Sequence, residues 1–348
     1  MVAGIELGKE YVQLCVKTDN MKEPESLSKI AGEEHYRMPT EADLGNQEEL
    51  LELFRRLWKL LLPYGNKDSL EHLVYCLEEN TACMREKLQN IAKIYNIPAE
   101  KISFMGKEEC FASYVIHQTG ELLAHNALLI ENHQGEKSKY LLHRHSKTVP
   151  AVLEVKSVSD KSLEGVFAEH GISSVFLVGD DFEEAWMGQY LKVLKTGKRI
   201  FMGKNLFVKG ACYLAWDLKE QKELFFYLGQ DKVKYHIMLQ TGQEGPERYT
   251  PVIPGGRNWY DSREEMDVIL MEDHSLEFAL VPVNGREKKT VVVELKDLPV
   301  RPPKTTRLHL RVEFTDAAHA RLEVVDLGFG ELFPKSDMVY EGELSWEQ

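Results

Sequence analysis

The chain has 348 residues, of which 43% are hydrophobic and 28% are charged, and its formal net charge is -13 at pH 7. This length suggests about two domains with a substantial core, in a protein of ordinary globular composition. An acidic chain without a basic block is a poor candidate for binding nucleic acid or an anionic membrane, and we exclude both as partners.

Strand and helix patterns alternate from the start of the chain to about residue 216. Residues 2–7 and 11–16 predict two strands of a hairpin that turns at residues 8–10. Apolar residues at helical spacing predict an amphipathic helix over residues 47–62. Further strands are predicted at residues 73–77, 102–104, 127–130, 139–143 and 175–178, and further helices at residues 78–95, 108–119, 161–170 and 205–211. This alternation is typical of an α/β domain, which we place at residues 1–222.

The pattern changes after residue 223, where short alternating strands follow one another without a helix. Turn signals at residues 243–246, Gly255-Gly256 and Asn284-Gly285 separate these strands. The predicted strands are residues 224–228, 233–240, 266–271, 276–282, 290–295, 306–314 and 320–326. Such a series predicts a β-sandwich, which we place at residues 223–348.

The cysteines and the first residues of the chain bear on its compartment. The five cysteines, none in a Cys-x-x-Cys pair, are Cys15, Cys76, Cys83, Cys110 and Cys212. Their odd number and apolar neighbours predict reduced, mostly buried thiols, and Cys110 is interpreted as a core residue rather than a nucleophile. Residues 1–16 lack a signal-peptide pattern, and no window approaches the roughly 20 apolar residues of a membrane-spanning helix. We therefore expect a cytoplasmic protein.

The region around residues 175–216 carries a family resemblance. An apolar strand ends in Gly179-Asp180-Asp181 and runs into a helix, and a second helix carries the pair Gly210-Ala211. This order resembles the adenosine-binding end of the superfamily of actin, sugar kinases and DnaK-type chaperones. In that superfamily the strand ends in two glycines and the later Gly-Ala pair packs closely. Gly179 matches the first glycine, whereas Asp180 replaces the second.

Other segments extend the resemblance over nearly the whole chain. Residues 4–8 resemble the first phosphate loop, residues 128–135 the second, and residues 73–77 and 108–114 the elements between them. Residues 291–299, with the strands that follow, are similar to the later strands of the chaperone sandwich. The chain thus looks like a shortened DnaK-type chaperone, without the peripheral subdomains and the helical lid. The resemblance implies an actin-like, ribonuclease H-like nucleotide-binding domain followed by a peptide-binding β-sandwich.

The resemblance also implies a site for ATP with Mg²⁺, in which two glycine-rich turns hold the phosphates and carboxylates hold the hydrated metal. The matching positions are Glu6, Gly8, Lys9, Glu131, Gly135, Gly179, Asp180 and Gly210. Several loop residues depart from the family pattern. Glutamates replace both loop aspartates, Lys9 and Glu10 replace hydroxyl residues, and His133 and Gln134 replace glycines. Side chains obstruct the approach of phosphate to the backbone, and Glu10, Asp180 and Asp181 repel it. We predict that the fold is retained, that hydrolysis is lost, and that ATP binding is weakened or lost.

Two other polar groups are candidates for a site. His133, His143 and His145 lack the spacing of a known metal motif, so we predict no metal site there. The basic cluster Gly197-Lys198-Arg199 is interpreted as a solvated helix end.

The second domain offers candidate residues for binding a partner. Arg257, Trp259 and Tyr260 follow the turn glycines of residues 255–256, a composition suited to a contact loop. Alternatively, Trp259 and Tyr260 are an aromatic pair that packs on its own sheet. Residues 327–334 form either a docking segment or the closing strand.

These observations lead to a functional hypothesis and an alternative. The leading hypothesis is a non-catalytic chaperone-like or scaffold protein that binds a protein or peptide through its sandwich. The alternative is a divergent ATPase of the same superfamily that still binds and slowly hydrolyses ATP. A sugar or acetate kinase is disfavoured because no segment resembles a substrate-binding insert with a catalytic base. The superfamily assignment further predicts that the loops at Glu6, Glu131 and Gly179 lie close together around a cleft.

Overall fold

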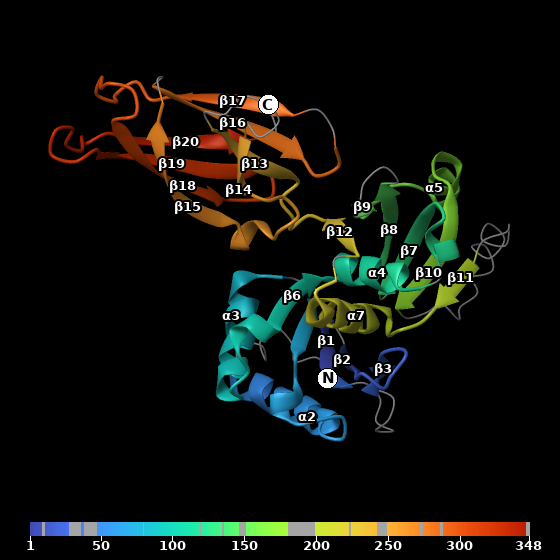
Figure 1. The fold of residues 1–348 in the computed structure, drawn as a ribbon. Helices are drawn as coiled ribbons and strands as arrows, with labels where there is room; N and C mark the ends of the chain where they lie inside the picture. Colours follow the sequence, from blue (N-terminus) through green and yellow to red (C-terminus); the bar gives the residue numbers. More distant parts are fainter. Residues whose placement is uncertain are drawn as a thin grey trace. The chain divides into compact units, whose positions relative to one another are not determined.

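The computed structural model describes most of the chain, and the described residues divide into two compact units (Figure 1). Unit 1 comprises Met1–Arg144 and Leu153–Phe225, and unit 2 comprises His145–Val152 and Phe226–Gln348. The described residues are 1–8, 11–27, 36–37, 47–78, 80–118, 120–133, 136–145, 151–179, 199–222, 224–241, 249–271, 274–285 and 288–345. The helix predicted after Asp181 and the turn predicted at residues 243–246 lie outside them.

The first sheet of unit 1 begins with the predicted hairpin. Its strands are β1 (Val2–Leu7), β2 (Tyr11–Lys17), β3 (Glu25–Ser26), β5 (His72–Leu77) and β6 (Ile102–Gly106), in the order β3-β2-β1-β5-β6, with β4 (Tyr36–Arg37) paired to β2. β1 is antiparallel to β2 and parallel to β5, and β5 is parallel to β6. The carboxyl ends of β1, β5 and β6 therefore lie along one edge of the sheet.

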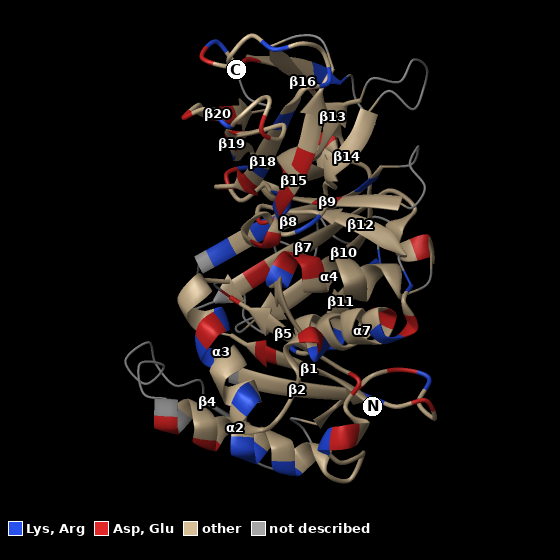
Figure 2. Ribbon diagram, turned by 60° about the vertical axis from the view of Figure 1, so that its left-hand side comes forward, with Lys and Arg blue, Asp and Glu red and all other residues tan. Residues whose placement is uncertain are grey.

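Two helices, α2 (Gln47–Leu61) and α3 (Ala82–Ile94), pack on one face of this sheet. Apolar side chains at helical spacing, among them Phe54 and Ile91, form a core with Ile5 and Tyr75 of the strands. The charged residues of α2, blue and red in Figure 2, include the exposed pair Glu52 and Arg55. The 3₁₀ turns η2 (Lys67–Ser69) and η3 (Ala99–Lys101) precede β5 and β6.

The second sheet of unit 1 has the same connectivity as the first. Its strands are β7 (Asn126–His133), β8 (Glu136–His145), β9 (Ala151–Ser157), β10 (Ile172–Gly179), β11 (Arg199–Met202) and β12 (Phe225–Leu228), in the order β11-β10-β7-β8-β9-β12. β7 is antiparallel to β8 and parallel to β10, which is parallel to β11. The first strand of each sheet, β1 or β7, is therefore central. It has an antiparallel neighbour on one side and a parallel neighbour on the other. Unit 1 is therefore α/β, as predicted, and α5 (Leu163–Glu169) packs on the second sheet.

Two central helices, α4 (Lys107–Ile116) and α7 (Leu206–Glu220), pack against each other and connect the two sheets. A Cβ on Gly4 would lie 2.7 Å from the backbone nitrogen of Cys212, so α7 crosses β1 at backbone contact. A Cβ on Gly210 would lie 1.9 Å from the carbonyl oxygen of Cys110 on α4. On its other side α4 contacts the second sheet, where Phe111 and Phe176 pack edge to face with ring centroids 5.5 Å apart.

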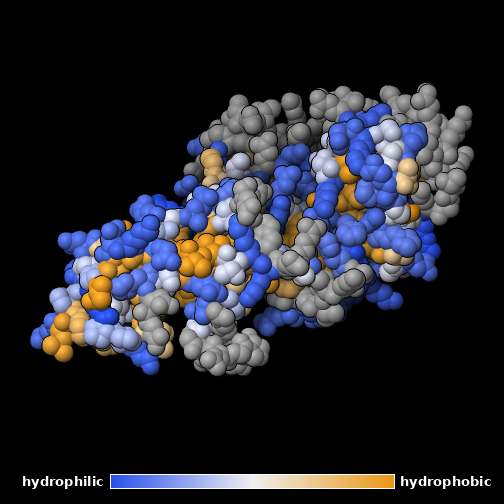
Figure 3. Space-filling view, turned by 90° about the horizontal axis from the view of Figure 1, so that it is seen from above, coloured by the Kyte–Doolittle hydropathy of each residue, from blue (hydrophilic) through white to orange (hydrophobic). Residues whose placement is uncertain are grey.

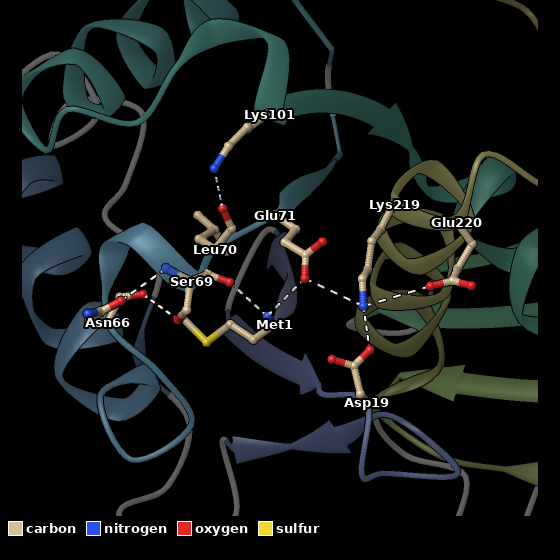
Figure 4. A network of polar contacts seen from close by, with 9 residues as sticks. All are labelled: Met1, Asp19, Asn66, Ser69, Leu70, Glu71, Lys101, Lys219 and Glu220. Carbon is tan, nitrogen blue, oxygen red and sulfur yellow. Dashed lines mark hydrogen bonds and ion pairs between the residues drawn. The ribbon is translucent and has the colours of Figure 1, made fainter.

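A polar network at the amino ends of β1, β5 and β6 links α7 to the first sheet (Figure 4). The Lys219 ammonium on α7 pairs with Asp19 and lies 3.5 Å from Glu71, directly before β5. The backbone amine of Met1 donates to the carbonyl of Ser69 at 2.7 Å. This network lies at the end of the sheet opposite the carboxyl ends of its parallel strands.

Unit 2 consists of two four-stranded sheets with a shared core. In the first sheet the order is β14 (Tyr249–Ile253), β13 (Tyr235–Gln240), β16 (Ser275–Pro282) and β17 (Lys289–Glu294). In the second it is β15 (Arg263–Leu270), β18 (Thr306–Phe314), β19 (His319–Gly328) and β20 (Val339–Ser345). Neighbouring strands are antiparallel. Alternate residues of both sheets, such as Phe278 and Leu310, lie in one hydrophobic core.

Some elements of the structure were not predicted. β9, β11, β14 and β20 were missed, and Arg199 begins β11 rather than lying at a helix end. Within the described part of unit 2 the only helical element is the 3₁₀ turn η5 (Trp259–Asp261). The strand predicted at residues 224–228 is β12, but it belongs to neither of the two four-stranded sheets of unit 2. Cys15, Cys76, Cys110 and Cys212 are free and buried as predicted, whereas Cys83 is exposed. None of the described helices is long and apolar enough to cross a membrane.

A substitution that adds one methyl group at Gly210 tests the close packing of α7 against α4. Gly210→Ala should lower the free energy of unfolding by about 1–3 kcal/mol or more, because the new Cβ would overlap backbone atoms of α4. The measurement is a urea titration followed by circular dichroism. Gly120→Ala is the matched control, since no described atom lies within 4 Å of its Cβ position. Equal stability of the two variants would contradict the close contact of α4 and α7.

Candidate functional site

Four charged residues gather where parallel strands end in unit 1. Glu6 lies near the end of β1, Glu78 follows β5, and Lys107 follows β6 as the first residue of α4. Glu131 lies near the end of β7 in the second sheet. The carboxyl ends of parallel strands are the usual location of ligand sites in α/β proteins. This cluster of Glu6, Glu78, Lys107 and Glu131 is therefore the candidate site.

The ammonium of Lys107 is the centre of the cluster. Its Nζ donates to Oε1 of Glu78 at 2.9 Å and to Oε1 and Oε2 of Glu131 at 3.1 and 3.2 Å. The side chain of Lys107 is 11% exposed, that of Glu78 22% and that of Glu131 3%. The Lys107 Nζ also lies 5.7 Å from the centroid of the Phe207 ring on α7. One lysine thus connects the first sheet, the second sheet and α7.

The charges of this cluster hold Lys107 in its ionised form. Burial by itself would lower the pKa of Lys107, but the carboxylates of Glu131 and Glu78, which also accept its hydrogen bonds, outweigh burial and raise the pKa. Lys107 is therefore positively charged over the whole physiological pH range.

Glu6 differs from the other two glutamates of the cluster. Its Oε2 atom is buried and has no hydrogen-bond partner among the described residues. Burial raises the pKa of Glu6 to about 8, and the charges of Glu131 and Glu78 add to this effect. Lys107 and a hydrogen bond from the backbone of Val208, in the first turn of α7, oppose it. Glu6 is consequently protonated to a large extent at neutral pH.

The predicted nucleotide-site residues are distributed as follows. Glu6 and Glu131 belong to the cluster, and Gly8 lies just beyond the end of β1. Gly179 ends β10 with φ +111°, and its Cβ would lie 2.1 Å from the carbonyl oxygen of Asn132 on β7. Gly210 lies on α7 against α4. The other loop residues fall outside the described part of the chain: Lys9, Glu10, Gln134, Gly135, Asp180 and Asp181.

Sequence reasoning missed Glu78 and Lys107. Glu78 directly follows the strand predicted at residues 73–77, and Lys107 lies three residues after the strand predicted at residues 102–104. Parallel strands bring such residues to one edge, so their position was a usable signal. No signal in the sequence indicates the ion pair between Lys107 and Glu131, which are 24 positions apart in the chain.

A hydrated Mg²⁺ between Glu6 and Glu131 does not fit the residues present. Both carboxylate oxygens of Glu131 accept hydrogen bonds from Lys107, and Glu6 is largely uncharged at neutral pH. No group of three metal-ligating side chains occurs among the described residues. Of the histidines considered as ligands, His143 lies with its Nδ1 2.7 Å from Oδ1 of Asn126.

In unit 2, the candidate partner-binding residues lie in and beside η5. Trp259 is partly buried and packs against the core. Its ring and that of Tyr260 form a T-shaped pair with centroids 5.5 Å apart. Arg257 is exposed and lies 3.6 Å from Glu264. Figure 3 shows apolar side chains over the left-hand part of the view, where unit 2 lies. The exposed apolar residues of unit 2 include Leu332, which is 87% exposed and lies in the segment of residues 327–334.

The chain combines an α/β unit with an all-β unit, and comparison with known proteins shows its family. It belongs to a family of unknown function, DUF5716, whose C-terminal model matches residues 41–230, more than half of the chain. A domain of unknown function, DUF8552, matches residues 232–346. A search of curated proteins finds no match.

Two solved structures are distantly similar to this chain. A Ppx/GppA phosphatase from Aquifex aeolicus is 13% identical with a TM-score of 0.31, over 51% of this chain and 67% of that one. An exopolyphosphatase from Cytophaga hutchinsonii is 8% identical with a TM-score of 0.33, over 56% and 71%. At these TM-scores the similarities carry no argument about this chain.

The pKa of Glu6 predicts a pH dependence of stability. The pKa is 4.5 in an ordinary environment and about 8 in the folded chain. The folded state therefore holds this proton more tightly than the unfolded state. The resulting contribution of Glu6 to the free energy of unfolding is complete below about pH 4.5 and is lost as pH rises through about 8. Replacing Glu6 by Gln should remove this slope, which amounts to on the order of a few kcal/mol.

The measurement is a series of urea titrations between about pH 5 and pH 9 on the wild type and Glu6→Gln. Glu52→Gln is the control, because Glu52 is exposed on α2 and its variant should keep the wild-type slope. Parallel curves for all three proteins would show that Glu6 is ionised normally in the folded state.

Proposed function

We propose that this protein is a non-catalytic chaperone-like or scaffold protein that binds a protein or peptide partner through unit 2. Unit 1 is a divergent actin-like domain whose nucleotide site no longer supports hydrolysis. The observation that carries this proposal is the ion pair of Lys107 with Glu131. It occupies a carboxylate that a nucleotide-bound metal would need.

Two features of unit 1 support this proposal. Its two sheets share one connectivity around the central helices α4 and α7, which gives unit 1 the framework proposed here. The two glutamates at the loop positions are both engaged within the protein, Glu131 with Lys107 and Glu6 as a buried, largely protonated acid. A buried charge that already has a partner has little to gain from a second cation, because it is already paired. Unit 1 is therefore a framework rather than a catalyst.

The edges of the sheets in unit 2 support peptide binding. β17 ends its sheet and, in the described part of the chain, pairs only with β16. Its sequence is rich in valine, and Val292 is 53% exposed. An extended peptide can add to such an edge through backbone hydrogen bonds, while its side chains fill neighbouring pockets. The proposed partner is thus a segment of protein in an extended conformation.

A divergent ATP hydrolase is the second candidate, and Glu6 favours it. A buried carboxyl with a pKa of about 8 holds its proton near neutral pH and is suited to donate it as a general acid. In that case the ion pair of Lys107 would have to open when nucleotide binds. The two candidates differ in whether ATP turns over.

Purified protein should show no multiple-turnover hydrolysis of ATP in the presence of Mg²⁺, because Glu131 is paired and Glu6 is largely neutral. A phosphate-release assay and a melting curve with ATP and Mg²⁺ measure hydrolysis and binding, since a bound ligand raises the melting temperature. Turnover that is lost in both Glu6→Ala and Glu131→Ala would establish the hydrolase instead.

The candidate partner residues in and beside η5 are tested separately from the β17 edge, and they predict a separation of binding from stability. Arg257→Ala and Tyr260→Ala should leave the melting temperature within a few degrees, because both side chains lie outside the core. Both variants should retain fewer members of a library of extended peptides than the wild type. Trp259→Ala is the comparison, since Trp259 packs against the core and its loss should also lower stability. Unchanged peptide retention in the variants and after deletion of unit 2 would rule out this surface.

A further inference from the structure

The three hydrogen bonds of Lys107 satisfy its ammonium completely. An ammonium has three N–H donors, and the three oxygens at 2.9, 3.1 and 3.2 Å are Oε1 of Glu78 and both oxygens of Glu131. Glu78 follows a strand of the first sheet, and Glu131 belongs to the second sheet. Lys107 therefore makes the kind of connection between two carboxylates that a bound metal ion makes in other proteins.

A lysine and a divalent ion would differ in the positive charge that they bring to this cluster. Lys107 contributes one positive charge against the two carboxylates of Glu78 and Glu131, so the ionisation of a third buried carboxyl, Glu6, adds uncompensated negative charge. A divalent ion would balance two carboxylates and would favour the ionised form of the third. The buried Glu6 Oε2, which has no hydrogen-bond partner among the described residues, agrees with the smaller charge.

We propose, building on the loss of the nucleotide site argued above, that the ammonium of Lys107 is a built-in cation. It takes the place of a divalent metal ion between Glu78 and Glu131 and joins the two sheets of unit 1 without a ligand. The wild-type protein consequently excludes divalent ions from this cluster. Removal of the ammonium leaves the carboxylates of Glu78 and Glu131, which both contact its Nζ, without a cation between them, and carboxylate oxygens are the hard ligands that Mg²⁺ and Mn²⁺ take.

Mn²⁺ is the probe for the test, because its free concentration is measured directly by electron paramagnetic resonance. The proteins are the wild type, Lys107→Ala, Glu131→Gln, the double variant Lys107→Ala with Glu131→Gln, and Lys59→Ala as a control at an exposed lysine of α2. Melting temperatures are measured in EDTA and in millimolar Mn²⁺. The wild type and Lys59→Ala should melt at the same temperature in both buffers and should bind no Mn²⁺ at the cluster.

Lys107→Ala should melt several degrees lower than the wild type in EDTA, because a buried carboxylate loses its partner. Mn²⁺ should restore much of this loss and should be bound with release of a proton from Glu6. The double variant lacks the unpaired charge, so it should melt above Lys107→Ala in EDTA and should not respond to Mn²⁺.

Two results would overturn the proposal. One is Mn²⁺ binding by the wild type that Glu131→Gln abolishes. The other is a Lys107→Ala variant that gains no stability from Mn²⁺, or that folds in neither buffer while the double variant folds. Hydrolysis of ATP by the wild type would contradict the proposed function but leave these Mn²⁺ measurements, made without nucleotide, to decide the role of Lys107.

Discussion

The close packing of α7 is the constraint on which unit 1 depends. The helix crosses β1 at Gly4 and contacts α4 at Gly210, in both cases at distances where a Cβ would overlap backbone atoms. These contacts place the first turn of α7 beside the candidate site, so that the backbone of Val208 bonds Glu6 and the Phe207 ring lies near Lys107. The electrostatics of the site are therefore a consequence of helix packing.

This packing also explains why Glu6 and Glu131 behave differently. Both are glutamates near strand ends, and both are removed from water. Glu131 lies within hydrogen-bond distance of Lys107 and is compensated, whereas Glu6 feels the same lysine at longer range together with two negative charges. Burial without a full partner is relieved by protonation, because a neutral carboxyl costs far less to bury than an ion. Lys107 thus compensates Glu78 and Glu131 by direct hydrogen bonds and leaves Glu6 without a full partner.

The sequence predicted the parts of the fold that local patterns encode. The hairpin of β1 and β2, the helix α7 from its first turn, and the strand β18 at residues 306–314 were all expected. β11 was missed because it has four residues, mostly exposed, and β20 because polar and charged residues occupy much of it. The pairing of Lys107 with Glu131 depends on how two sheets with the same connectivity are joined, and no local pattern contains that information. For the same reason, Glu6 and Glu131 were predicted as site residues, while Lys107, which bonds Glu131, was not.

Because Lys107 is part of α4, the cation that connects the two sheets of unit 1 is also part of the folded chain. A metal ion held by carboxylates can leave, and with it the connection between two sheets can open and close. An ammonium attached to α4 cannot leave, so the connection lasts as long as α4 is folded. Its strength depends on pH only through neighbours such as Glu6, because Lys107 itself stays charged. In the proposed function, a unit that is held together in this way keeps its arrangement without a nucleotide, and the sheet edges of unit 2 are the proposed place for a partner.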